Sequence, residues 1–182
     1  HHDGSIPNDN PRLDGWAPEI FSIGHRNPQG LAFHPSTGAL WSHEHGPRGG
    51  DEINIITAGD NYGWPTVSHG KEYIGGSIGI GTSAPGLADP EWVWTPSVAP
   101  SGMAFYRGPM FPQLNGHLLV GSLKFKRLYL VQLSAGVPQD EFVILDGSIG
   151  RVRDVAVEPD GAILLLSDEP NGGLYRLYEA GQ

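Results

Sequence analysis

The sequence of 182 residues contains no cysteine. This absence excludes disulfide bonds, thiolate nucleophiles and zinc sites built on thiolate ligands. It leaves the cellular compartment open, because proteins outside the cytoplasm can also fold without disulfides.

Basic residues are few as well. There are 11 Lys and Arg against 20 Asp and Glu, which gives a formal net charge of −9. A phosphate backbone would be repelled by this average charge, and no run of Lys and Arg with interleaved aromatic residues offers a local exception. We therefore expect no nucleic-acid partner.

Long apolar runs are also missing. No stretch approaches the roughly 18 apolar residues that a membrane-spanning helix needs, so we expect no membrane span. The first residues, His1 to Pro7, lack the basic and apolar regions of a signal peptide, which fits a signal that was removed or that lies on a missing segment. His1 and His2 fit a tag remnant as well as native sequence.

Glycine and proline, in contrast, are abundant. The 27 glycines and 16 prolines are spread along the chain, a composition that favours many short strands joined by tight turns. This pattern predicts an all-β fold without long helices.

An internal repeat defines the expected architecture. Similar units begin at Gln29, Ser101 and Arg153, and each continues through a turn that contains glycine into a second apolar strand. Further alternating strands follow at 51–56, 127–133 and 173–177. Repeated four-stranded units of about 40 to 50 residues are typical of a β-propeller, so we predict about three blades. The segment from Val67 to Trp94 is expected to be a long excursion between strands on one face, where function is often located.

Three blades cannot close a ring, because propellers typically need about four to eight. We therefore expect residues 1–182 to be part of a single propeller domain. A missing amino-terminal half, another chain or a second copy would complete the ring.

The segment from Glu44 to Glu52, followed by Asn61 to Pro65, has the composition of a cation and cofactor site. Gly46 and Pro47 would present carbonyl oxygens on a constrained turn, and Asp51 with Glu52 adds the hard anionic oxygens that calcium prefers. Taken alone, however, two adjacent carboxylates are more often solvated turn residues.

Six motifs in order carry a family resemblance: Gly24 to Gly30, Glu44 to Glu52, Asn61 to Pro65, Thr95 to Ser101, Ser122 to Lys124 and Gly150 to Val155. As an ordered set, they resemble the soluble quinoprotein glucose/sorbosone dehydrogenase family, and more closely its bacterial aldose sugar dehydrogenase branch. The resemblance implies a six-bladed propeller that holds pyrroloquinoline quinone (PQQ) and calcium. It covers nearly the whole chain but only the carboxyl-terminal half of a family member.

The resemblance implies roles for individual residues. Gly46 and Pro47 would hold the catalytic calcium through their carbonyl groups, and Glu52 would bind a structural calcium with the backbone oxygen of Tyr62, with Asp51 as a weaker candidate. Thr95 departs from the aromatic residue found there in some members, which leaves the sugar preference open. The implied cofactor-binding residues are Arg26, Asn27, Ser97, Lys124, Arg151 and Arg153.

The implied reaction is oxidation of the anomeric hydroxyl of an aldose to a lactone, with PQQ as oxidant, calcium as Lewis acid and a histidine as base. The family's base belongs to a Gly-Asp-His motif in the amino-terminal half, and this sequence contains no such motif. We therefore expect no catalytic base in this chain, with Arg26 in a supporting role, and no activity of the chain by itself. The resemblance also implies a periplasmic or secreted location and an electron acceptor as partner.

Simpler interpretations exist for most of these residues. His43 and His45 flank Glu44 like half of a zinc site, but no third ligand is assured. Arg151 and Arg153 could pair with Asp154 on a blade face. Arg26 could likewise pair with Glu44. Three neighbouring cations could be no more than a solvated strand end: Lys124, Lys126 and Arg127. Four tryptophans could serve blade packing: Trp41, Trp64, Trp92 and Trp94.

Three functions from different classes compete. They are half of a PQQ sugar dehydrogenase, a calcium-dependent propeller lactonase or similar hydrolase, and a non-catalytic binding propeller. Lys124 with Arg151 and Arg153 favours the first, because only an anionic cofactor needs three converging cations. The missing base keeps the binding module open for the isolated chain.

Overall fold

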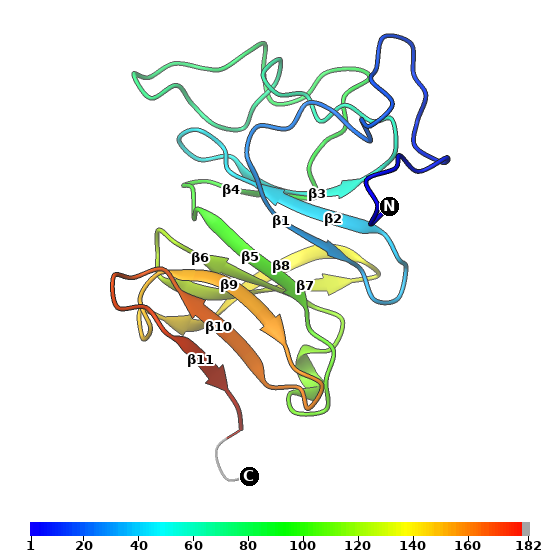
Figure 1. Cartoon of the computed structure of the whole chain (residues 1–182). Coiled ribbons are helices and arrows are strands. Elements are labelled where there is room, and N and C mark those ends of the chain that lie inside the picture. The colour runs from blue at the N-terminus through cyan, green and yellow to red at the C-terminus, as the bar shows by residue number, and fades with distance from the viewer. Residues whose placement is uncertain (180–182) are drawn as a thin grey trace.

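The fold consists of three antiparallel sheets that follow one another along the chain, seen in a computed structural model that describes residues 1–179 (Figure 1). Each sheet is a meander in which strands adjacent in sequence are also adjacent in space. The first sheet contains β1 (Pro28–Phe33), β2 (Leu40–Glu44), β3 (Asp51–Ile56) and β4 (Trp92–Trp94). The second contains β5 (Pro100–Phe105), β6 (Leu118–Ser122), β7 (Arg127–Ser134) and β8 (Val137–Asp146). The third contains β9 (Val152–Val157), β10 (Ile163–Ser167) and β11 (Leu174–Leu177).

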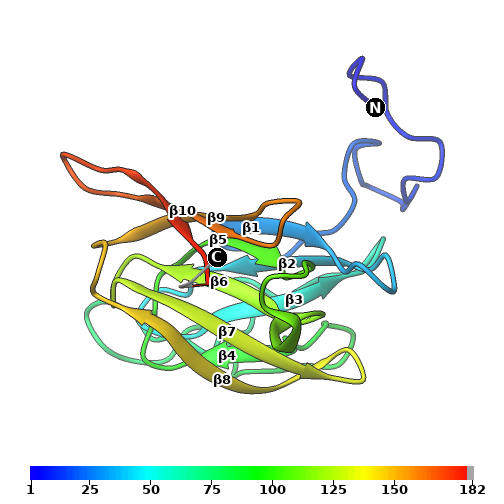
Figure 2. The same ribbon diagram turned by 90° about the horizontal axis from the view of Figure 1, so that it is seen from below.

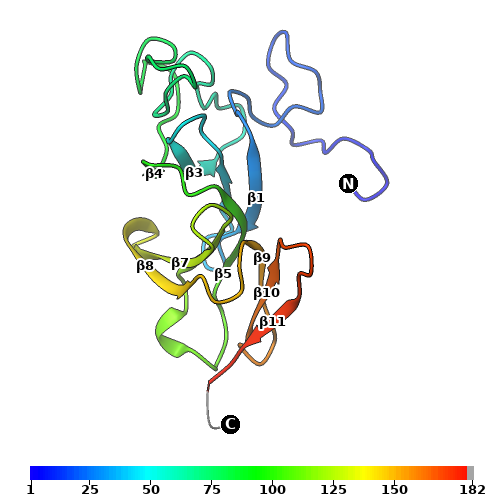
Figure 3. The same ribbon diagram turned by 90° about the vertical axis from the view of Figure 1, so that its left-hand side faces the viewer.

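The sheets are arranged as successive propeller blades. The first strands of the three sheets lie next to one another, because β1 contacts β5 and β5 contacts β9. Figure 2 shows these three strands gathered on one side, while β4 and β8 lie on the other. Figure 3 shows the sheets stacked along the chain from β1 to β11. The predicted all-β propeller blades are confirmed, and the third blade has three strands in the part of the chain that the structure describes.

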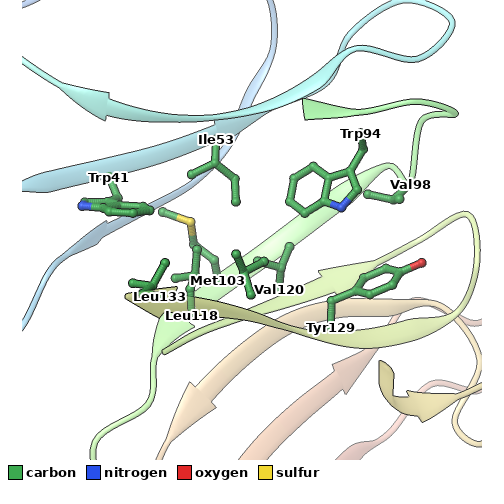
Figure 4. Packing of buried hydrophobic residues seen from close by; sticks show 10 residues of the cluster. Trp41, Ile53, Trp94, Val98, Met103, Leu118, Val120, Tyr129 and Leu133 are labelled. Atoms are coloured by element: carbon green, nitrogen blue, oxygen red, sulfur yellow. The ribbon is translucent and has the colours of Figure 1, made fainter. Parts of the chain in front are cut away.

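Strands β5, β6 and β7 of the middle sheet are largely buried, and strand alternation divides their side chains between two cores. Leu118 and Val120 of β6 pack toward the first sheet with Trp41 and Ile53 (Figure 4). Leu119 between them packs toward the third sheet. The second core also contains Val155, Ile163 and Leu165 of the third sheet. A large apolar side chain contributes about 1.5–3 kcal/mol when fully buried, so these two layers hold the three blades together.

The outer faces of the two end sheets are different. Leu31 and Phe33 of β1 are 64% and 69% exposed, and Leu174 of β11 is 68% exposed. Alternation explains the pattern in β1, because Ala32 between the two exposed residues packs into the first core. The two end faces thus present apolar side chains that no residue in 1–179 covers fully.

Helical structure is minimal, as predicted. The single helix within residues 1–179 is the short 3₁₀ helix η1 (Pro112–Leu114). It is far too short to cross a bilayer, and no other candidate span is present in the described part of the chain.

The long excursion between strands begins earlier than the sequence predicts. It extends from residue 57 to residue 91, because β3 ends at Ile56 and Trp92 already pairs with Ile53 in β4. Residues 57–66 leave the sheet and pair with the segment before β1, where Ile23 forms a bridge with Asn61. The Tyr62 hydroxyl donates to the Ile55 carbonyl at 2.6 Å and accepts the Thr57 amide at 2.9 Å.

Tyr106 joins the second and third blades through a hydrogen bond as well as by packing. It is fully buried, and its hydroxyl donates to the Gly161 carbonyl at 2.7 Å and accepts the Phe111 amide at 2.9 Å. We expect Tyr106→Phe to lower the free energy of unfolding by about 2 kcal/mol, because two buried polar groups lose their partner. Urea unfolding of the purified protein would measure this, and a loss below about 0.5 kcal/mol would contradict the inference. Tyr178→Phe is a suitable control, because Tyr178 is 55% exposed.

Candidate functional site

The predicted site residues cluster at one end of the three sheets. In a meander, the segment before the first strand and the turn between the second and third strands lie at the same end. Arg26 and Asn27 precede β1, the turn 45–50 joins β2 to β3, Ser97 lies between β4 and β5, and Lys124 lies between β6 and β7. Arg151 directly precedes β9 at this end, which is at the left of Figure 1.

Three of the predicted residues line one open hollow. Its volume is about 410 Å³, and its walls are Pro47, Arg48, Gly49, Pro96, Ser97 and Lys124. The volume falls in the range of small-molecule sites. Two of the six residues are cationic and none is a carboxylate, so the hollow suits an anionic ligand. The exposed Lys124 ammonium also lies 5.1 Å from the centre of the Phe125 ring.

Asp51 lies behind this hollow and is fully buried. Its Oδ1 accepts the Gly46 amide at 2.9 Å, and its Oδ2 accepts the Ser97 hydroxyl at 2.7 Å and the amides of Val98 and Ala99 at 2.8 Å each. These four bonds favour an organising role for Asp51 over the weaker candidacy as a calcium ligand.

Glu52 points to the opposite face of β3, into a second and much smaller cavity. Glu52 pairs directly with Glu44 across β2 and β3, and the Asn54 amide group bridges the two carboxylates at 3.4 and 3.5 Å. Burial, the nearby Glu44 charge and, to a lesser degree, Asp51 raise the pKa of Glu52 to about 7, against a lowering effect of Asn54. The cavity has about 10 Å³ of room, enough for a single water or ion, and Gly46, Gly50 and Tyr62 also line it.

Tyr62 covers this cavity from the excursion. Its side chain is buried and stacks on the His25 ring at 4.7 Å between centroids, and its amide donates to the Ile23 carbonyl at 2.8 Å. Burial raises the pKa of the Tyr62 phenol. The side-chain hydroxyl is thus committed to local backbone groups, and the predicted contribution of Tyr62 through its backbone oxygen stays a prediction.

Arg26 and Asn27 are held through their backbone by Glu44. The Glu44 Oε2 accepts the Arg26 amide at 2.5 Å and the Asn27 amide at 3.2 Å. The simpler interpretation of an Arg26–Glu44 ion pair is therefore corrected, because the guanidinium instead donates to the His45 carbonyl at 3.0 Å. The guanidinium also lies 5.3 Å from the Trp64 ring centre. The Asn27 side chain is exposed and accepts from Gln29.

Arg151 and Arg153 come together on a single carboxylate, that of Asp168 between β10 and β11. Asp168 Oδ2 lies 2.9 Å from Arg151 and 2.7 Å from Arg153. Hydrogen bonds from Arg153 and Arg151 lower the pKa of Asp168. The sequence suggested Asp154 as partner, which was wrong, because Asp154 Oδ1 accepts a backbone amide of Val155 instead. The two arginines form a separate cluster and do not line the hollow of Lys124.

The zinc alternative finds no support. His43 is fully buried, and burial lowers the pKa of its ring to about 3, so the ring is neutral. His45 Nε2 lies 2.6 Å from the Pro100 carbonyl and must donate to it, because a carbonyl only accepts. Within residues 1–179, no group of three or more His, Cys, Asp or Glu side chains is placed to hold a metal.

Calcium nevertheless fits the Glu52 cavity chemically. Two adjacent carboxylates in a confined site, of which Glu52 has a raised pKa, are costly without a cation, and calcium accepts backbone and water oxygens as readily as carboxylates. Since only two acidic side chains meet there, carbonyl groups or water would supply the remaining ligands. PQQ fits the larger hollow, because an anionic tricarboxylate matches a lining that contains two cations and no carboxylate.

Sequence reasoning missed several residues of this region: Glu44 as backbone anchor, His25, Trp64 and Asp168. Glu44 was detectable, since strand pairing around a short turn places it opposite Glu52 on the same face. Trp64 was assigned to blade packing but lines the Glu52 cavity, whereas Trp41 and Trp94 are core residues and Trp92 packs against the core, as expected. No local signal identified Asp168.

Comparison with known proteins gives a consistent result. The family model described as Glucose / Sorbosone dehydrogenase matches residues 1–176. The chain is 43% identical over 178 residues to aldose sugar dehydrogenase YliI of Escherichia coli K12, and this match covers 96% of the chain and 48% of that protein. It is 30% identical over 228 aligned residues to quinoprotein glucose dehydrogenase B of Acinetobacter calcoaceticus, covering 96% of the chain and 48% of that protein.

Two solved structures are similar in fold. The apo form of the soluble aldose sugar dehydrogenase from Escherichia coli superposes with a TM-score of 0.91 at 43% identity, covering 96% of this chain and 51% of that one. The PQQ-bound aldose sugar dehydrogenase from Streptomyces coelicolor gives 0.74 at 27% identity, covering 97% and 49%. The chain therefore spans about half the length of the relatives it matches.

Proposed function

Because this chain belongs to the Glucose / Sorbosone dehydrogenase family, we propose that it forms the carboxyl-terminal half of a propeller enzyme that oxidises aldoses with PQQ and calcium. The product would be the lactone formed at the anomeric carbon. The names of the relatives support sugar oxidation and a quinone cofactor, and one similar structure is described as PQQ-bound.

One observation carries the proposal. Pro47, Ser97 and Lys124 come from three different inter-strand segments and meet in a single cationic hollow. A binding module without an anionic ligand has no need of this arrangement. A hydrolase that holds its metal with side-chain carboxylates would need a larger acidic cluster than residues 1–179 contain.

The residues of the chain would bind and orient the cofactor. Lys124 would bind its anionic oxygens in the hollow that Ser97 lines, Arg26 and Asn27 would bind it from the segment before β1, and Arg151 and Arg153 would add positive charge. The carbonyl groups of Gly46 and Pro47 would hold the catalytic calcium, and Glu52 with the Tyr62 backbone oxygen would hold the structural one. When bound, PQQ supplies a two-electron oxidant and calcium a Lewis acid.

The proton acceptor would lie outside this chain. His45 donates its Nε2 proton to Pro100, and His25 Nε2 is bonded to the Ser22 hydroxyl at 2.9 Å, so both rings are engaged locally. We propose that a Gly-Asp-His histidine in the other half of the ring removes the sugar proton, and that this chain by itself is inactive. The proposal further includes a periplasmic or secreted location and an external electron acceptor.

Titration with PQQ tests the function directly. In the full-length protein that carries this chain, we expect calcium-dependent PQQ binding and reduction of a dye in the presence of glucose. Lys124→Met should weaken PQQ binding about tenfold, because it removes one exposed charge-assisted contact. Lys126→Met is the matched control, because Lys126 is close in sequence but does not line the hollow.

A complete protein that ignores PQQ in the presence of calcium would show that the cofactor assignment is wrong. Equal effects of the two lysine substitutions would show that the hollow is not the PQQ site.

A further inference from the structure

Asp51 connects a turn within the first blade to the segment that leads from the first blade to the second. We infer that Asp51 is a positioning residue that fixes the Gly46–Pro47 turn and the Ser97–Ala99 segment as one preformed unit, and that it is not a calcium ligand. The inference rests on the proposed function for its consequence on PQQ binding. Its structural part stands on the geometry of this chain.

The hydrogen bonds of Asp51 are divided unequally between its two oxygens. Oδ1 accepts one donor, the Gly46 amide, and this bond closes the turn that leads into β3. Oδ2 accepts three donors from the segment between β4 and β5, namely the Ser97 hydroxyl and the Val98 and Ala99 amides. Oδ2 is therefore saturated by its three donors, and Oδ1, which keeps one lone pair, lines neither the hollow nor the Glu52 cavity, so Asp51 is not placed to hold a cation at either site.

The two segments form adjacent walls of the same hollow. Pro47 and Gly49 belong to one wall, and Pro96 and Ser97 belong to the other. Gly46 lies within the first sheet's own turn, whereas Ser97 lies on the connection from the first sheet to the second. The position of one wall relative to the other therefore depends on the Asp51 carboxylate.

The backbone of the Ser97–Ala99 segment needs the Asp51 carboxylate as a hydrogen-bond partner. Ala99 has a φ of 51°, a left-handed conformation that costs a residue with a side chain roughly 1–2 kcal/mol. The Ala99 amide donates both to Asp51 Oδ2 at 2.8 Å and to the Ser97 hydroxyl at 3.2 Å, which offsets this cost. Without the carboxylate the segment would relax away from the hollow.

Strand alternation separates Asp51 from its neighbour Glu52. Asp51 and Ile53 face the second sheet, whereas Glu52 and Asn54 face the small cavity with Glu44. The two adjacent carboxylates thus serve different sites. Substitution of Asp51 should weaken PQQ binding, whereas substitution of Glu52 should change the response of stability to calcium.

Asp51→Asn provides the sharpest test in the full-length protein. The Asn side chain has one oxygen, and we expect this oxygen to take the place of Oδ2 and accept the three donors of residues 97–99. Its NH₂ group then faces the Gly46 amide. Because two N–H groups cannot hydrogen-bond to each other, the turn is released. We expect PQQ binding in calcium to weaken at least about tenfold. Calcium binding at the Glu52 site of the PQQ-free protein, measured as stabilisation by calcium at pH 8, should stay within about twofold of wild type, because Glu52 faces the other side of β3.

Hydrogen exchange followed by mass spectrometry gives a readout that does not depend on PQQ. Peptides that cover 45–50 should exchange faster in Asp51→Asn, while peptides that cover 97–100 should change less. Leu118→Ala is the control for general destabilisation, because Leu118 is fully buried at the far end of β6 from the hollow. It should weaken neither PQQ binding nor local protection of 45–50.

Three results would overturn the inference. Loss of calcium binding at the Glu52 site in Asp51→Asn would make Asp51 a ligand of that calcium, and unchanged protection of 45–50 would show that it does not hold the turn. If the variant fails to fold, fast exchange of the Gly46, Val98 and Ala99 amides in the ligand-free wild-type protein would equally contradict a preformed unit. Failure of wild-type PQQ binding would refute the proposed function alone, because the exchange results do not depend on it.

Discussion

Gly46→Ala weakens calcium-dependent PQQ binding by about 100-fold, which is the largest effect we expect from so small a change. A Cβ at Gly46 would come within 3.0 Å of the carbonyl oxygens of Gly49 and Gly50. These neighbours are backbone atoms, and the Asp51 carboxylate holds the Gly46 amide from the other side, so the turn cannot shift without losing that bond. Overpacking of this kind costs about 1–3 kcal/mol, and 3 kcal/mol corresponds to roughly two orders of magnitude in affinity.

PQQ titration of the full-length protein at saturating calcium would measure this loss. Gly116→Ala is the control, because Gly116 has a φ of 83° but a Cβ there would meet no atom within 4 Å, at the end of the sheets away from the hollow. It should cost some stability through backbone strain and leave PQQ affinity unchanged. If Gly46→Ala bound PQQ with an affinity within about threefold of wild type, PQQ binding would not depend on the tight closure of the turn at 45–50.

We expect Glu52→Gln to remove the stabilisation of the fold by calcium, and also part of the pH dependence of the free energy of unfolding. The pKa of Glu52 rises from 4.5 to about 7 on folding, so the calcium-free folded state holds its proton more tightly than the unfolded chain. This contribution to stability is fully present below about pH 4.5 and is lost as the pH rises through 7. At about 1.4 kcal/mol per pKa unit, the loss is up to about 3 kcal/mol. Calcium should offset it, since a bound cation favours the ionised carboxylate.

Urea unfolding at pH 5 and pH 8, with calcium and with chelator, separates these effects. Wild-type protein should lose stability between pH 5 and pH 8 in chelator and regain it with calcium. Glu52→Gln should show a flatter pH profile in chelator and little response to calcium. Glu91→Gln is a suitable control because Glu91 is exposed and lies outside the cavity. A wild-type response to calcium that is larger at pH 5 than at pH 8 would contradict the assignment of Glu52.

The sequence was sufficient to predict the positions of the strands, because the pattern that marks a strand lies within the strand and its flanking turns. Glycine turns between alternating apolar segments located β3 at Asp51–Ile56 without error, and they located β7 and β11 to within one residue. The apolar run Leu118 to Val120, which breaks the alternation of apolar and polar residues, is covered on both faces in the structure.

The sequence was insufficient where a partner comes from a distant segment. Asp51 looked like a metal ligand because Gly46 and Glu52 are its neighbours in the chain, but three of its four donors lie in 97–99, on the next blade connection. Similarly, Arg151 and Arg153 suggested the adjacent Asp154, whereas the turn after β10 delivers Asp168. Composition cannot show which loop folds back onto which, because that depends on how the blades stack.

The start of β3 also restricts how this region can change over evolutionary time. An insertion or deletion of one residue beside Asp51 would invert the two carboxylates, turning each away from its own site and toward that of the other. The excursion at 57–91, which is not paired within the sheet along most of its length, carries no such constraint. Length variation among relatives should therefore concentrate in the excursion, while the spacing from Gly46 to Glu52 stays fixed.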